Sequence, residues 1–184
     1  MNARIPALAR RGALAALLAT SALVLGCASP QPADYAAEKP VLDLKTYFNG
    51  ELVAHGIFTD RSGKVARRFV VQMTGTWTGN QGVLDERFTY SDGKTERRVW
   101  RLTDLGNGRW EGRADDVVGV ATGVSSGNAL NWRYTLALPV DGKVYEVQFD
   151  DWMYLVDEKV MLNKAEMSKF GIRLGEVTLS FTKK

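Results

Sequence analysis

Two pairs of adjacent aspartates, Asp115-Asp116 and Asp150-Asp151, are the groups in this 184-residue chain that are best placed to do chemistry. Neighbouring residues of a β-strand point to opposite faces of a sheet, so each pair should send one carboxylate to each face. The alternation of apolar residues around them predicts that Asp116 and Asp151 point inward. Two carboxyl groups that share a cavity can act as a general acid and a general base in hydrolysis.

An inward-facing acid must be paired with a cation or keep its proton, because burial disfavours the charged form. The candidate partners are Arg98, which shares a strand face with Trp100, and Lys169 or Arg133. Glu86 is a third candidate for an inward acid. Three interpretations stay open: a salt-bridge network that fixes strand register, a polar patch that orients a ligand head group, and catalysis by Asp116 and Asp151. The candidate ligand-binding residues are Glu86, Arg98, Trp100, Asp116, Trp132, Tyr134, Asp151 and Met153.

Other common chemistries lack the residues they need. The chain has one cysteine and one histidine, which excludes a disulfide framework and leaves no ligand set for a structural zinc site. His55 has no serine or cysteine partner in a recognisable motif, which disfavours a nucleophilic triad. No glycine-rich loop follows a strand and opens a helix. We therefore predict no metal and no cofactor, and the sequence leaves open whether the protein is an enzyme.

The elements that must position these side chains are predicted to be β-strands. Turn signals recur along the chain, for example at 61–64, 91–94 and 141–143. Between them lie runs rich in Val, Thr, Phe, Tyr and Trp with alternating polarity, and no amphipathic helix of useful length is evident. This pattern predicts an all-β, antiparallel up-and-down barrel of about nine to ten strands, calycin- or lipocalin-like, because closure leaves no exposed sheet edge. A barrel of this size can hold a small ligand.

The first 26 residues have the pattern of a secretory signal peptide. Three arginines precede an apolar run at 12–25, which is too short to span a membrane as a helix. The run ends in Val-Leu-Gly-Cys at 24–27, which resembles the lipobox of bacterial lipoproteins. The resemblance implies that Cys27 is lipidated, becomes the mature N-terminus and anchors the protein to a membrane.

The proline- and alanine-rich segment 27–40 is predicted to be a flexible tether to a single barrel domain at 41–184. Ala28 stands where an aspartate would retain an enteric lipoprotein in the inner membrane, which favours an outer-membrane anchor facing the periplasm. The net charge of +3 belongs to the signal peptide, because the 24 basic residues, less its three arginines, balance the 21 acidic residues. A nucleic-acid partner is therefore not expected, and the oligomeric state is left open.

Several longer segments carry a family resemblance that runs from about Leu42 to Phe181. They include residues 114–119, 127–134 and 149–155, with Ala-Asp-Asp-Val-Val-Gly in the first and Phe-Asp-Asp-Trp-Met-Tyr-Leu in the last. These segments resemble a family of proteobacterial lipoproteins known only as domain of unknown function 3833. The family has no established activity, so the resemblance implies an envelope protein and no particular reaction.

These observations together predict an outer-membrane-anchored periplasmic lipoprotein that binds a lipid or another hydrophobic small molecule inside a β-barrel. One alternative is an enzyme that acts on such a molecule through its inward-facing carboxylates. Another is a non-catalytic interaction module of the cell envelope. The barrel interior should distinguish them, because ligand sites usually occupy about 300 to 1,000 Å³, whereas an interaction module needs no cavity.

Overall fold

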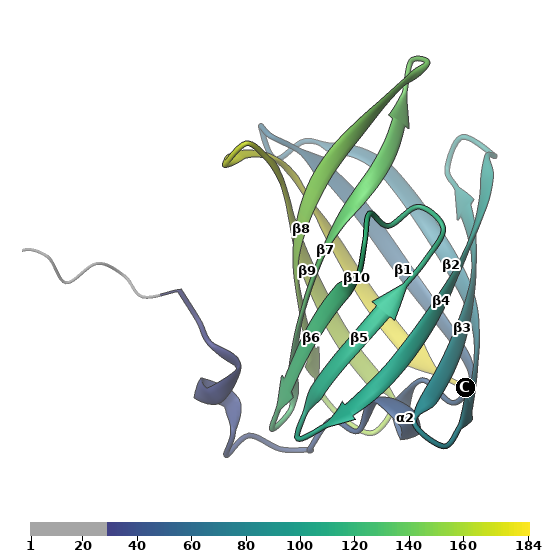
Figure 1. The fold of residues 1–184 in the computed structure, drawn as a ribbon. Helices are drawn as coiled ribbons and strands as arrows, with labels where there is room; N and C mark the ends of the chain where they lie inside the picture. Colours follow the sequence, from purple (N-terminus) through teal and green to yellow (C-terminus); the bar gives the residue numbers. More distant parts are fainter. Residues whose placement is uncertain (1–28) are drawn as a thin grey trace, which may run out of the picture. The chain divides into compact units, whose positions relative to one another are not determined.

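Ten β-strands follow one another around a closed barrel in the computed structural model, which describes residues 29–184 (Figure 1). Each strand pairs antiparallel with the next one in sequence, and β10 pairs with β1 to close the barrel. This confirms the predicted all-β up-and-down barrel. The strands are β1 (Gly50–Asp60), β2 (Val65–Thr78), β3 (Gln81–Tyr90), β4 (Thr95–Gly106), β5 (Arg109–Arg113), β6 (Ala121–Ser126), β7 (Ala129–Val140), β8 (Lys143–Leu155), β9 (Val160–Lys169) and β10 (Ile172–Lys183).

Tight turns with positive backbone φ angles join many of these strands. The two-residue turns Asn107-Gly108 and Asp141-Gly142 have φ values of 55° and 70°, and of 49° and 77°. Two consecutive positive φ angles define the type I′ turn, whose twist matches that of the flanking strands. Asn and Asp tolerate the first position and Gly the second, so these hairpins follow directly from local sequence.

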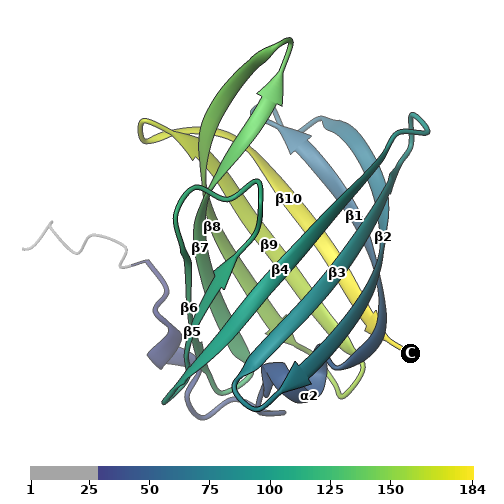
Figure 2. The same ribbon diagram turned by 45° about the vertical axis from the view of Figure 1, so that its right-hand side comes forward.

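One end of the barrel is covered by the short helix α2 (Leu44–Tyr47), as Figures 1 and 2 show; we call this the helix end. The side chains of Leu44, Tyr47 and Phe48 are buried and belong to the larger apolar core cluster inside the barrel. The Nζ of Lys183, from the last strand, donates hydrogen bonds to three carbonyl oxygens, those of Thr46 at 2.8 Å, Tyr47 at 2.9 Å and Asn49 at 2.6 Å. We call α2 together with Phe48 the plug of the barrel. A positive charge at a helix C-terminus is favourable, so Lys183 helps to hold the plug in place.

The opposite end of the barrel carries four hairpin turns, those of β1–β2, β3–β4, β7–β8 and β9–β10; we call this the hairpin end. In Figure 1 the β7–β8 hairpin projects farthest from the barrel at this end.

Inward-facing side chains fill most of the interior between the two ends. They form one cluster of buried apolar residues around α2 and a smaller one around Leu136, Val147 and Phe149.

The part of the predicted tether that the structure describes packs against the barrel from Gln31 onward. It contains the short 3-10 helix η2 (Pro32–Tyr35), and the Tyr35 ring lies 5.8 Å from that of Trp152 and 5.2 Å from that of Tyr154. The compact unit runs from Gln31 to Lys184. The predicted signal peptide and Cys27 lie outside the described residues. Within the described part of the chain, no helix is long and apolar enough to cross a membrane.

Candidate functional site

A cavity of about 100 Å³ lies inside the barrel, between the plug and the middle of the strands. Polar and apolar side chains share its wall, and seven of the eight predicted ligand-binding residues are among them. The lining residues are Leu44, Phe48, Leu84, Glu86, Arg98, Trp100, Leu102, Leu130, Trp132, Tyr134, Asp151, Met153 and Phe181. The predicted residue that does not line it is Asp116.

Strand register explains why these residues meet. Glu86 on β3 is paired with Arg98 on β4, and Trp132 on β7 is paired with Asp151 on β8. Directly paired residues of antiparallel strands point to the same face, so each pair enters the interior together. In a ring of ten strands β3 and β8 are five strands apart in either direction. The two pairs therefore approach the cavity from opposite walls.

Arg98 is held by an acid that does not come from a strand. Its Nε lies 2.8 Å from Oδ2 and 3.1 Å from Oδ1 of Asp116, and its Nη2 lies 2.7 Å from the same Oδ2. Asp116 sits in the turn between β5 and β6 rather than in a strand, and its side chain is 38% exposed. The prediction assumed that Asp116 lies on a strand with its side chain inward, and this assumption was wrong. Asp116 lies in a loop and reaches Arg98 from there.

Glu86 faces the same guanidinium at a longer distance, with its Oε2 3.9 Å from Nη1 of Arg98. Burial raises the pKa of Glu86 to about 7; the charge of Arg98 opposes this rise, and the carboxylate of Asp116 adds to it. Because Arg98 is already neutralised by its close contact with Asp116, it compensates Glu86 only in part. Glu86 is therefore poised to gain or lose a proton near neutral pH.

Asp151 is the second buried acid in the cavity wall, and burial raises its pKa to about 7 as well. A hydrogen bond from the Asn163 amide opposes the rise, whereas the negative charges of Asp150 and Glu86 reinforce it. Its sequence neighbour Asp150 points to the outer face, where it accepts hydrogen bonds from Asn131 at 2.6 Å and Arg133 at 3.1 Å. The two members of this pair thus face opposite sides, as the alternation predicted.

Asn163 is a residue of the site that the sequence analysis missed. It is 2% exposed, and its Nδ2 also donates to the carbonyl oxygen of Trp152 at 3.2 Å. Its Oδ1 is buried and has no hydrogen-bond partner among the described residues. With the amide turned by 180°, that oxygen would accept a hydrogen bond from a protonated Asp151. The signal was available in the sequence, as an amide between Met161 and Ala165 on an otherwise apolar strand face.

Trp132 explains both the small residues nearby and the small size of the cavity. A β-carbon at Gly112 would lie 2.6 Å from Cζ2 of Trp132, and one at Gly123 would also collide with its ring. The indole thus lies directly on the backbone of β5 and β6. It packs edge-on against Trp100, with ring centres 5.7 Å apart. The interior is therefore largely filled, and the remaining cavity of about 100 Å³ is smaller than most ligand sites. By the criterion of interior volume, this disfavours a barrel that encloses a whole hydrophobic ligand and favours the interaction module.

The arrangement can hold a compact polar group rather than a complete lipid. Two carboxyl groups that titrate near neutrality face it from opposite walls, and aromatic rings close its sides. Burial also raises the pKa of Tyr134, so its hydroxyl stays protonated and able to donate. Asp116 and Asp151 do not share the cavity; Glu86 takes the place that was predicted for Asp116. Among residues 29–184, no group of three or more His, Cys, Asp and Glu side chains could hold a metal ion.

Comparison with known proteins places this barrel in context. A family model described as "Protein of unknown function (DUF3833)" matches residues 21–183. No curated protein matches the sequence. The S-type phycobiliprotein lyase CPES from Guillardia theta has a similar structure, with a TM-score of 0.60 and 5% identity over 84% of this chain and 98% of that chain. A protein of unknown function from the DUF3598 family of Nostoc punctiforme has a TM-score of 0.50 and 11% sequence identity, over 80% of this chain and 51% of that chain. At these identities the likeness concerns the fold alone.

Proposed function

The chain belongs to the DUF3833 family, and we propose that this member is a lipid-anchored envelope protein whose barrel binds a small hydrophobic molecule by its polar group. The observation that carries the proposal is the cavity in which Glu86, Arg98 and Asp151 converge among aromatic rings. A few buried polar groups in an otherwise apolar pocket typically fix the orientation of a ligand.

The size of the cavity limits what can enter. About 100 Å³ accommodates a group of several heavy atoms and not an acyl chain. We therefore propose that the ligand inserts its polar group, while its apolar part extends toward the hairpin end between inward-facing rings such as Phe69, Phe88 and Tyr90.

Native mass spectrometry of the protein purified from its own membrane tests this proposal. We expect a bound small molecule on the wild-type chain and on Asp150→Asn, whose altered side chain faces outward. Asp151→Asn should retain the molecule about tenfold less well, because one hydrogen bond to a charged group is lost. Equal retention by the two variants would place the molecule outside this cavity. No bound molecule on any chain would contradict ligand binding and favour the envelope interaction module.

Catalysis on such a molecule is the second candidate, and the pair that favours it is Glu86 and Asp151. Two acids with pKa values near 7 on opposite walls of one cavity can exist in different protonation states at neutral pH. The molecule that native mass spectrometry identifies is the substrate to test. Turnover that disappears in both Glu86→Gln and Asp151→Asn, measured at concentrations of the molecule that saturate each variant, would establish an enzyme.

The membrane anchor is a separate part of the proposal and rests on the sequence at 24–28. We expect the mature wild-type chain to carry a lipid on Cys27, facing the periplasm from the outer membrane. Intact-mass measurement should show the lipid on the wild-type chain and its loss in Cys27→Ala. In Ala28→Asp the lipid should remain, and the protein should move to the inner-membrane fraction on a density gradient. A wild-type chain without lipid would exclude the anchor and leave the barrel proposal intact.

A further inference from the structure

Phe170, in the turn between β9 and β10, has a backbone conformation that is unfavourable for phenylalanine. Phe170 has a φ of 52° and Gly171 a φ of 75°, the same type I′ geometry as the turns at 107–108 and 141–142. Those two turns begin with Asn and Asp, which tolerate the left-handed region, whereas a bulky side chain there is strained. The side chain of Phe170 is also 89% exposed. Neither backbone conformation nor packing within the described chain accounts for a phenylalanine at this position.

Phe170 shares the hairpin end with other exposed apolar side chains. Ile172 follows it on β10 and is 56% exposed, and Val140, Val144 and Tyr145 are exposed on the neighbouring β7–β8 hairpin. The Nζ of Lys169 lies 4.8 Å from the centre of the Tyr145 ring and 5.2 Å from that of Phe170, which links the two hairpins. We call this set the apolar rim. It consists of Val140, Val144, Tyr145, Phe170 and Ile172.

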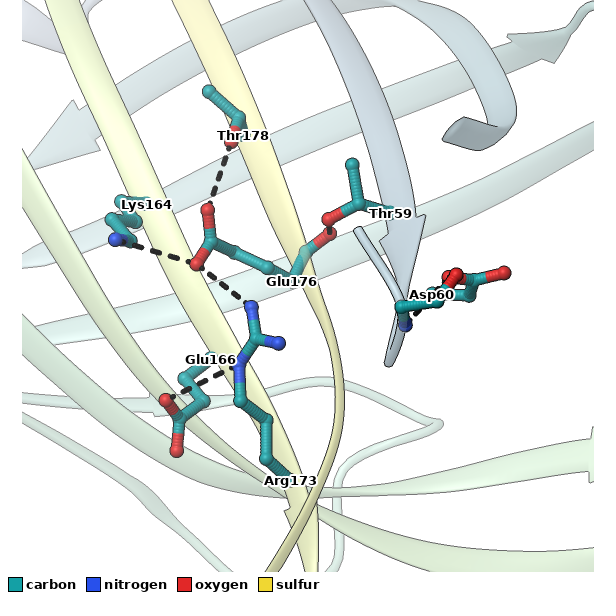
Figure 3. Close-up of polar contacts among 8 residues, drawn as sticks. Thr59, Asp60, Lys164, Glu166, Arg173, Glu176 and Thr178 are labelled. Carbon is teal, nitrogen blue, oxygen red and sulfur yellow. Dashed lines mark hydrogen bonds and ion pairs between the residues drawn. The ribbon is translucent and has the colours of Figure 1, made fainter. Parts of the chain in front are cut away.

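Ion pairs join the two strands at the base of the β9–β10 hairpin, which carries Phe170 at its turn (Figure 3). Arg173 lies between two acids, with its Nε 3.6 Å from Glu166 and its Nη2 3.2 Å from Glu176. Glu176 also pairs with Lys164 at 3.4 Å, and its carbonyl oxygen accepts a hydrogen bond from the hydroxyl of Thr59 on β1 at 3.3 Å. These ion pairs join β9 to β10, and the hydrogen bond from Thr59 ties the hairpin to β1.

Charged side chains of both signs lie around the apolar rim, including the exposed acids Glu96 and Glu146, and the cations include a lysine in every hairpin. Each of the four hairpins at this end has one lysine beside its turn: Lys64, Lys94, Lys143 and Lys169. Two of the nearby acids are engaged locally. Asp60 accepts backbone hydrogen bonds within its own turn, and Asp92 pairs with Arg67 at 3.0 Å. The other acid in these turns, Asp141, is exposed beside Lys143.

We propose that the hairpin end docks on the surface of a bilayer that contains anionic lipids. Exposed aromatic and aliphatic side chains among lysines bind at the boundary between headgroups and acyl chains, where burial of apolar area and attraction to anionic lipids add together. Phe170 enters this boundary, and the lysines lie over the lipid phosphates. This docking stands without the proposed ligand. Together with it, the docked barrel would take up a hydrophobic molecule directly from the bilayer.

Vesicle binding by a chain that starts at Ala28 tests the docking without the anchor; the compact unit from Gln31 to Lys184 is intact in that chain. Flotation with vesicles of phosphatidylcholine and phosphatidylglycerol should show binding that weakens without phosphatidylglycerol and in 0.5 M NaCl, where the Debye length is roughly 4 Å. Phe170→Asn should bind about tenfold more weakly, from the apolar area it removes. It should also unfold at a higher temperature than the wild-type chain, because Asn suits the turn.

Val156→Asn is the matched control, since it removes an exposed valine from the helix end and should leave vesicle binding unchanged. Three results would overturn the proposal. The first is a wild-type chain that does not float with anionic vesicles. The second is a Phe170→Asn chain that binds like the wild type or loses stability. The third is self-association that disappears in Phe170→Asn without any vesicle binding, which would assign the apolar rim to a second copy of the chain.

Discussion

Glu86→Gln should stabilise the protein at pH 8 by about 2–3 kcal/mol more than it does at pH 5. Burial raises the pKa of Glu86 from its ordinary value of 4.5 to about 7. Between these two values the folded chain keeps a proton that the unfolded chain has released, so the folded state loses stability as the pH rises. Above pH 7 the loss is complete, and each pKa unit of difference corresponds to roughly 1.4 kcal/mol. Glutamine carries no proton equilibrium and abolishes this loss.

Urea unfolding of wild type and variant at pH 5 and pH 8 measures this difference directly. Asp151→Asn should likewise stabilise the protein more at pH 8 than at pH 5, because burial also raises the pKa of Asp151 to about 7. The double variant should gain less stability than the sum of the two single variants, since the negative charge of Glu86 raises the pKa of Asp151. Glu158→Gln, at an exposed turn, is the control and should show no such difference. An equal effect of Glu86→Gln at both pH values would show that Glu86 is ionised in the folded protein throughout.

Gly75→Ala should destabilise the barrel by about 3 kcal/mol, because it displaces the plug. A β-carbon at Gly75 would collide with the carbonyl oxygen of Phe48, just after α2. That oxygen belongs to the backbone and cannot rotate away, so the segment that carries Leu44 and Phe48 must move as a whole. Overpacking a close-packed core typically costs about 1–3 kcal/mol, and loss of the buried plug residues adds to it.

Two measurements distinguish plug displacement from general weakening of the barrel. Urea unfolding gives the loss of stability, and limited proteolysis should cut the Gly75→Ala chain within residues 41–49 before the strands. Thr76→Ala, on the outer face of the same strand, is the matched control and should behave like the wild type. If Gly75→Ala were as stable and as resistant as the control, the contact between Phe48 and β2 would not hold the plug.

The strand pattern of the barrel could be predicted because it rests on local rules. Alternating polarity identifies the inward face of each strand, and turns such as Asp141-Gly142 mark where strands end. The same alternation brought seven of the eight predicted ligand-binding residues to one cavity, because their inward orientation follows from period two. The rule did not apply at Asp116, which lies in a turn. There the backbone follows its contacts with β7, including a hydrogen bond from the Val118 amide to the Thr135 carbonyl at 2.9 Å.

The sequence by itself determined the fold class, the inward faces of the strands and the family, since each is written in residues close together along the chain. The tertiary structure alone decided that Glu86 rather than Asp116 faces Asp151, and that the Asn163 amide donates a hydrogen bond to Asp151. It also decided that Trp132 lies on Gly112 and Gly123 and leaves only about 100 Å³ free. These features depend on which strands meet across the closed ring and on the summed volumes of their side chains. Both arise from contacts between distant parts of the chain, which local patterns do not record.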